Sequence, residues 1–169
     1  GIEALRDGAE QTVPVAMATA AAGIVIGVVL QTGLAIRFTS FLVGIAGTSL
    51  LLALLITMAA AIILGMGMPT TAAYIMLAAL LIPALIKLGV SPMAAHMFLL
   101  YFGIMSMVTP PVALSAFAAA NIAGADVDKT GWTATRIGWA AYIVPFLFAL
   151  SPSLLMRGDA LTIAWAVGT

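Results

Sequence analysis

The apolar residues of this chain fall into long runs that charged residues interrupt at only a few places. No Asp, Glu, Lys or Arg occurs from Phe38 to Ile86 or from Leu88 to Ala125. A charge at the centre of a bilayer costs at least about 2.5–3.5 kcal/mol on insertion scales, so such runs mark membrane segments. A helical span needs about 20 apolar residues. The pattern therefore predicts an all-α integral membrane protein.

The runs divide the chain, residues 1–169, into segments of a single membrane domain. The expected segments are a transmembrane helix at 12–37, a connector at 38–47, a helical hairpin at 48–86, a broken helix at 92–123, a transmembrane helix at 136–156 and a tail at 157–169. Pro145 predicts a kink in the last helix, because proline removes a helical hydrogen bond. Thr19, Gly23 and Gly27 recur at four-residue spacing, which favours close helix packing.

The two arms of the hairpin, 48–64 and 70–86, are joined only by Gly-Met-Gly-Met-Pro at 65–69. A connection that crosses an aqueous interface normally carries charge or several polar residues, and this one carries neither. We therefore expect a re-entrant hairpin whose tip stays at membrane depth. Irregular backbone is tolerated there only against protein or a water-filled cavity. Two ordinary spans joined by an apolar loop are the alternative.

The segment 92–123 is interrupted by Val-Thr-Pro-Pro at 108–111. Pro110 and Pro111 lack amide protons and would clash with the carbonyls of Ser106 and Met107 in a continuous helix. Proline also disfavours the α conformation of the residue that precedes it. The two prolines therefore predict a discontinuous helix.

Each interruption predicts free carbonyls at the end of one half-helix and free amides at the start of the next. Free carbonyls with hydroxyls suit Na⁺, whereas free amides with hydroxyls suit a carboxylate. Paired interruptions of this kind are typical of secondary-transporter binding sites. The candidate Na⁺ ligands are Gly65, Gly67, Thr70, Ser106, Met107 and Thr109. The candidate substrate-binding residues are Thr70, Thr71, Thr109, Pro110 and Ser115.

Each of these residues also has a structural interpretation. Thr70 and Thr71 suit helix caps, and Ser106 and Thr109 suit hydrogen bonds to the preceding turn. Neither interrupted segment contains a carboxylate, and His96 is the one candidate for a proton relay. We expect His96 to be a buried, hydrogen-bonded structural residue. Na⁺ is therefore favoured over a proton as the coupling ion.

Composition narrows the class of protein further. Hydrophobic residues make up 64% and charged residues 7% of the chain, against about 45–50% and 25% in soluble domains. The six basic and six acidic residues leave no basic surface for nucleic acid. With no cysteine and one histidine, an all-protein zinc or haem site is not expected. No membrane segment holds a paired acid and base or a nucleophile beside a histidine, so no enzyme is predicted.

Two motifs resemble one transporter family. Residues 65–74, Gly-Met-Gly-Met-Pro-Thr-Thr-Ala-Ala-Tyr, look like the second hairpin tip of the large permease subunit of TRAP (tripartite ATP-independent periplasmic) transporters. The likeness is to DctM-like permeases of the TAXI type, in which small and large membrane subunits are fused. Residues 108–114, Val-Thr-Pro-Pro-Val-Ala-Leu, resemble that family's second unwound helix. The resemblance extends from about Glu3 to Met156.

The resemblance implies an elevator-type fold of the ion transporter superfamily, built from two inverted repeats, with this chain as the second, C-terminal one. It implies Na⁺ symport, without another cofactor, of organic acids such as C4-dicarboxylates across the bacterial inner membrane. The implied partners are a periplasmic substrate-binding protein, the remaining half of the permease, the small membrane subunit and the lipid bilayer. Half of a transporter holds half of a site, so this chain alone is not expected to transport.

Two alternatives to this function stay open. One is a non-transporting membrane scaffold or assembly subunit, whose glycines and prolines only shape helix packing. The other is another ion-coupled carboxylate symporter of the same superfamily. The chain opens on Gly1 rather than Met, so we expect a fragment or the C-terminal part of a longer permease, with a tag remnant as the other explanation.

Overall fold

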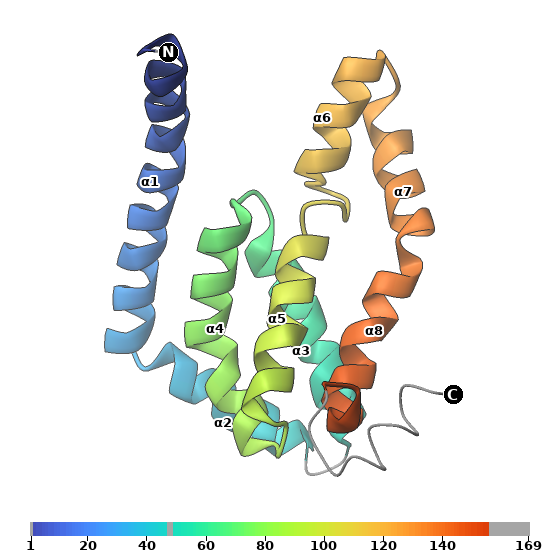
Figure 1. Cartoon of the computed structure of the whole chain (residues 1–169). Coiled ribbons are helices and arrows are strands. Elements are labelled where there is room, and N and C mark those ends of the chain that lie inside the picture. Colours follow the sequence, from blue (N-terminus) through green and yellow to red (C-terminus); the bar gives the residue numbers. More distant parts are fainter. Residues whose placement is uncertain (1, 47–48, 156–169) are drawn as a thin grey trace.

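The computed structural model describes residues 2–46 and 49–155, and this part of the chain is helical without strands (Figure 1). The helices are α1 (Ile2–Gln31), α2 (Leu34–Ala46), α3 (Leu50–Gly65), α4 (Thr70–Lys87), α5 (Pro92–Met105), α6 (Leu114–Ala123), α7 (Val127–Ile137), α8 (Trp139–Leu150) and a short 3₁₀ helix (Pro152–Leu155). The all-α prediction is confirmed for the described residues. The predicted tail at 157–169 lies outside them.

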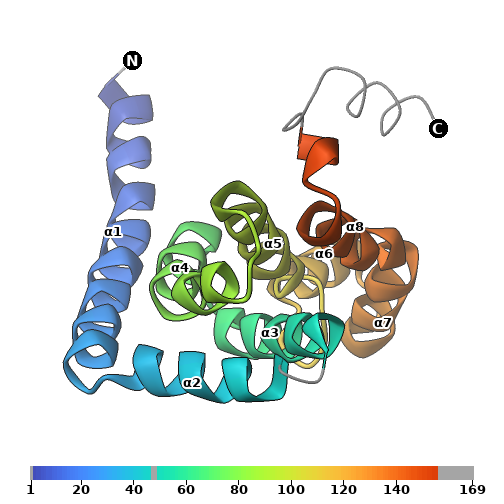
Figure 2. The same cartoon turned by 90° about the horizontal axis from the view of Figure 1, so that it is seen from below.

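Helices α3, α4 and α5 form the centre of the fold, with α1 on one side and the α7–α8 pair on the other (Figure 1, Figure 2). Helix α5 packs against α3, α4 and α8, and α2 runs across α3 and α4. The buried core lies mainly between α4 and α5, where Leu77, Leu81, Leu85, Phe98 and Phe102 have no exposed surface. This arrangement places the ends of α3 and α5 beside each other.

The expected hairpin corresponds to α3 and α4, joined through Met66–Pro69. Gly67 has a φ of +77°, a left-handed conformation that glycine adopts without a Cβ clash. Pro69 is extended, with ψ at 147°, and α4 begins directly after it. Glycine and proline thus end one arm and start the next, so the local chemistry of the tip explains the sharp reversal.

The predicted helix at 12–37 is wrong in its boundaries. Helix α1 begins ten residues earlier, at Ile2, and ends at Gln31, so the segment is divided between α1 and α2. The division falls at Gly33, whose φ is +66°, and the axes of Gly23–Val29 and Leu34–Ile45 meet at 65°. The expected connector at 38–47 is helical as far as Ala46, because α2 continues through it.

A bend that the sequence did not predict lies at Gly138, seven residues before Pro145. Pro145 lies buried inside the continuous helix α8, whereas α7 and α8 meet at 42° across Gly138. A Cβ at Gly138 would stand 3.2 Å from the carbonyl oxygen of Ala134, so the close approach at this bend favours glycine. The predicted helix at 136–156 therefore contains the end of α7, all of α8 and the 3₁₀ helix.

The discontinuous helix corresponds to α5 and α6, but the interruption covers 106–113 rather than 108–111. Tight turns precede the prolines, because the amides of Met107 and Val108 donate to carbonyls only three residues earlier. Helix α6 ends at Ala123 before Gly124, whose φ is +64°. The break is thus longer than its two prolines alone suggest.

The close packing that was expected along the α1 face of Thr19, Gly23 and Gly27 is not found at the two glycines. A Cβ on Gly23 or Gly27 would meet nothing within 4 Å, and the side chain of Thr19 is not among those described. Among the described helices, α4 is long and apolar enough to cross a membrane by itself. The number rises to three if α1–α2 and α7–α8 are each counted as one bent span.

Candidate functional site

The hairpin tip lies against the break between α5 and α6 (Figure 1). The hydroxyl of Thr70 donates to the sulfur of Met107 at 3.2 Å, across 37 positions of sequence. A Cβ built on Gly65 would stand 2.8 Å from the Oγ of Ser106. The structure therefore brings together the two interruptions that the sequence predicts.

Small residues allow this approach. Gly65 ends α3 and Gly103 lies in the last turn of α5, and a Cβ on Gly65 would stand 3.8 Å from the Cα of Gly103. Both glycines are buried. A Cβ on Gly103 would meet only Leu77 Cδ1, at 3.5 Å, so the missing side chain of Gly65 is the one that lets the tip approach the break.

The hydroxyls of Ser106 and Thr109 bond to the preceding turn of α5. Ser106 is fully buried and donates to the carbonyl of Gly103 at 2.7 Å. Thr109 donates to the carbonyl of Met105 and also bonds Tyr142 Oη at 2.6 Å. These are the hydrogen bonds to the preceding turn that the sequence offered as the alternative to ion binding. Each hydroxyl still retains acceptor capacity, because its oxygen carries two lone pairs.

The carbonyls at the break are less free than predicted. The carbonyl of Met107 accepts from the amide of Ser115 at 3.0 Å, which closes the turn into α6. The carbonyl of Val108 accepts from the hydroxyl of Thr135 at 3.1 Å. At the tip, the carbonyl of Gly65 accepts from the amide of Met68 at 3.4 Å. Each carbonyl keeps a second lone pair, so one further contact is available at each position.

The start of α4 offers amides. The amide of Ala73 donates to the carbonyl of Pro69 at 3.0 Å, so the amides of Thr70, Thr71 and Ala72 precede this first bond. The side chains of Thr71 and Ser115 are exposed, and neither Pro69 nor Ala113 caps its helix through a side chain. A negatively charged group at the α4 start would meet unpaired donors.

The sequence analysis missed three residues of α7 and α8 that contact the break: Gly131, Thr135 and Tyr142. A Cβ on Gly131 would stand 3.4 Å from Pro110 Cγ, and Thr135 and Tyr142 bond Val108 and Thr109. Gly131 and Thr135 are four residues apart, so they lie on the same face of α7. A small residue and a hydroxyl residue on one helix face were the sequence feature that could have indicated a contact surface. Their target could not be read from the chain, because it lies in another helix.

His96 lies away from these contacts. Its side chain is exposed, so the expected burial is wrong, but it is hydrogen-bonded as expected, with Nδ1 2.6 Å from Tyr74 Oη. An open cavity of about 510 Å³ adjoins the pair, lined by Tyr74, Pro92, Met93, His96, Met97 and Leu100. In the described part of the chain, no three His, Asp or Glu side chains gather to hold a metal ion.

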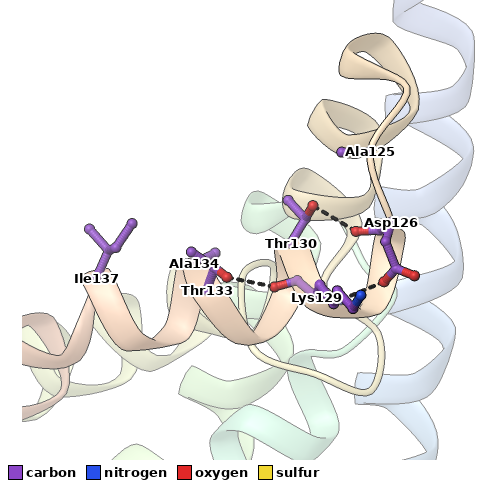
Figure 3. A pocket seen from close by; sticks show the side chains of 7 residues that line it. All are labelled: Ala125, Asp126, Lys129, Thr130, Thr133, Ala134 and Ile137. Atoms are coloured by element: carbon purple, nitrogen blue, oxygen red, sulfur yellow. Dashed lines mark hydrogen bonds between the residues drawn. The ribbon is translucent and has the colours of Figure 1, made fainter.

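A second cavity, of about 450 Å³, lies at the corner of α6 and α7 (Figure 3). Its lining residues are Ala125, Asp126, Lys129, Thr130, Thr133, Ala134 and Ile137. Asp126 Oδ1 accepts from the amide of Lys129 at 2.8 Å, and the Thr130 hydroxyl donates to the carbonyl of Asp126 at 2.7 Å. These groups cap and support α7, and none of the predicted site residues lines the cavity.

A protein-family model matches residues 2–158 of the chain. The matching family is described as "Tripartite ATP-independent periplasmic transporter, DctM component". No curated protein and no solved structure matches the chain significantly. The family match spans nearly the whole chain and includes the hairpin, the break and the α7–α8 pair, so the chain belongs to the DctM family of TRAP transporter membrane permeases.

Proposed function

We propose that this chain is the second repeat of a Na⁺-coupled TRAP permease, of the TAXI type, that imports organic acids across the inner membrane. The contact between hairpin tip and break carries the proposal. Thr70 reaches Met107, and Gly65 lies against Ser106, so two interrupted helices meet at one place. Binding sites of secondary transporters are typically built where discontinuous helices meet.

The available ligands favour Na⁺ as the coupling ion. Hydroxyl and carbonyl oxygens of Gly65, Ser106, Met107 and Thr109 have acceptor capacity left after their internal hydrogen bonds. The described tip and break contain no carboxylate, and His96 bonds Tyr74 rather than a residue of the break. Neutral oxygens can bind Na⁺ without a titrating group, whereas proton coupling normally uses an intramembrane acid or histidine.

The amides at the start of α4 favour a carboxylate as the substrate group. Thr70, Thr71 and Ala72 present donors at the positive end of the helix, and the side chain of Thr71 is exposed there. At α6 the exposed hydroxyl of Ser115 supplies a second polar group, although its amide is already bonded to Met107. Pro110 contributes backbone shape and contacts the Gly131 region.

The proposed partners follow from the family. A periplasmic binding protein would deliver the acid, and the first repeat with the small membrane subunit would complete the site. Large apolar side chains are exposed on several helices, Ile24, Ile63, Ile122 and Ile143 among them. Such surface suits lipid or other transmembrane helices as neighbours.

The test is uptake by the complete permease in proteoliposomes, with its binding protein loaded with an organic acid. An inward Na⁺ gradient should drive accumulation. An equal K⁺ gradient in its place should not drive accumulation, and a Na⁺ ionophore should abolish it. Accumulation that is indifferent to Na⁺ would contradict the proposed coupling. If the chain were only a scaffold, a permease lacking it would assemble poorly, but no variant at the tip would alter the ion dependence of uptake.

A further inference from the structure

We infer that Tyr142 is a positioning residue, which orients the hydroxyl of Thr109 as an ion ligand in the break. This inference rests on the proposed function. Thr109 and Tyr142 are 33 positions apart, on the break and on α8, and their hydroxyl oxygens are 2.6 Å apart. Neither the family description nor the interrupted motifs assign a role to Tyr142.

The direction of this hydrogen bond follows from counting protons. Thr109 has one hydroxyl proton, and it is donated to the carbonyl of Met105, which can only accept. Tyr142 must therefore donate its proton to Thr109 Oγ1. The Thr109 hydroxyl thus donates its proton to Met105 and accepts from Tyr142 with one lone pair. Its second lone pair stays free and points in a fixed direction. That remaining lone pair is the one available to a cation.

Aromatic packing holds Tyr142 in place. Phe146, one turn further along α8, packs edge-on against Phe98 and Phe102 of α5, with ring centroids 5.3 and 5.9 Å away. Phe98 and Phe102 are fully buried, and their own centroids are 4.8 Å apart. Edge-to-face contacts between large rings fix their relative orientation. The donor of Tyr142 is thus carried on a helix that is anchored to the same α5 that ends at the break.

Neighbouring residues of the break are held in the same way. Thr135 of α7 shares its hydroxyl proton between the carbonyls of Val108, at 3.1 Å, and Gly131, at 3.2 Å, and Gly131 lies against the ring of Pro110. Val108, Thr109 and Pro110 are consecutive, and each is contacted from α7 or α8. The α7–α8 pair therefore supports the geometry of the break. Among its residues that contact the break, Tyr142 is the one that bonds a candidate ion ligand.

The experiment replaces Tyr142 by Phe in the complete permease, which keeps the ring and removes the donor. The Na⁺ concentration for half-maximal uptake should rise about 2- to 10-fold, as expected for one hydrogen bond, while the maximal rate and the melting temperature stay near parental values. The double variant Tyr142→Phe/Thr109→Val should need no more Na⁺ than Thr109→Val alone, because Tyr142 acts through Thr109.

Tyr101→Phe is the matched control. Tyr101 lies on α5 and packs against Phe148 of α8, with centroids 5.9 Å apart, and its hydroxyl has no hydrogen-bond partner among the described residues. It should keep the parental Na⁺ dependence. A parental Na⁺ response in Tyr142→Phe, or effects of Tyr142→Phe and Thr109→Val that simply add, would overturn the positioning role. A parental permease without any Na⁺ response would instead overturn the proposed function, and the inference with it.

Discussion

Gly65 approaches Ser106 so closely that a Cβ on Gly65 would stand 2.8 Å from Ser106 Oγ and 3.2 Å from its Cβ. Ser106 cannot move aside easily, because it is fully buried and its hydroxyl donates to Gly103. This contact between α3 and the end of α5 holds the hairpin tip at the break. Adding a single methyl group at Gly65 is enough to test it.

Gly65→Ala should therefore weaken the tip–break contact by about 1–3 kcal/mol, the usual cost of overpacking a tight site. We expect a lower melting temperature and reduced Na⁺-driven uptake by the complete permease. Gly103→Ala is the control from the same region, because its Cβ would stand 3.5 Å from Leu77 Cδ1, an ordinary contact. Equal melting temperatures for the two variants would show that the Gly65 approach is not tight.

Thr70→Val and Thr109→Val should each raise the Na⁺ requirement about 2- to 10-fold, while each internal hydrogen bond lost with the hydroxyl costs about 0.5–1.5 kcal/mol of stability. Valine keeps the shape of threonine and removes the oxygen, which in Thr70 contacts Met107 Sδ. Uptake measured across a Na⁺ series tests this expectation. Thr133→Val is the control, since Thr133 is exposed and bonds only the carbonyl of Lys129 in its own helix. If all three variants behave alike, the hydroxyls at the tip and break serve only their internal hydrogen bonds and are not ligands.

Replacing Pro110 and Pro111 together by Ala should favour a continuous helix from α5 towards α6. Each proline-to-alanine change improves helix propensity by about 3 kcal/mol before context is counted, and restores an amide. The variant should insert and keep its melting temperature or exceed it, yet lose Na⁺-coupled uptake, because the turn carrying the Thr109 hydroxyl would be straightened. A stable variant that transports at the parental rate would remove the interruption from the mechanism.

Gly67→Ala should destabilise the hairpin by about 1–2 kcal/mol, because Gly67 adopts a φ of +77° that costs other residues this much. Space is not the obstacle, since the nearest atom to an added Cβ is Val112 Cγ1 at 4.0 Å. Gly67→Asn should cost less, as asparagine tolerates this conformation better. Thermal unfolding of the two variants checks the order, and a larger loss for Asn than for Ala would point to crowding instead of backbone conformation.

Local chemistry explains which parts of the structure were predictable. Glycine and proline mark the tip at 65–69 and the break near 108–111 so strongly that both appear where expected, with α4 starting at Thr70. The turn at Gly33 was missed because Gln31 and Thr32 before it are uncharged and no proline marks it. The bend at Gly138 was missed because Pro145 is the stronger helix breaker by propensity, yet packing in the core keeps α8 continuous around it.

The contacts that complete the candidate site were beyond prediction for a different reason. The bond from Tyr142 to Thr109 and the bond from Thr135 to Val108 join helices that are separated by a whole hairpin turn at α6–α7. Such pairs depend on the relative placement of helices, which hydropathy and spacing leave open. Sequence reasoning therefore located the interruptions but not the residues that hold one of them in shape.

The support of the break by α7 and α8 also bears on the order in which the site is assembled. Helices α3, α4 and α5 are consecutive in sequence and pack on one another, so their contacts close over short chain separations. The partners of Val108, Thr109 and Pro110 come later, from residues 131–142. During synthesis the hairpin tip and the end of α5 can meet first, whereas the geometry of the break is completed only when the C-terminal helices dock. Maturation of the candidate site is therefore one of the last events in the biogenesis of this domain.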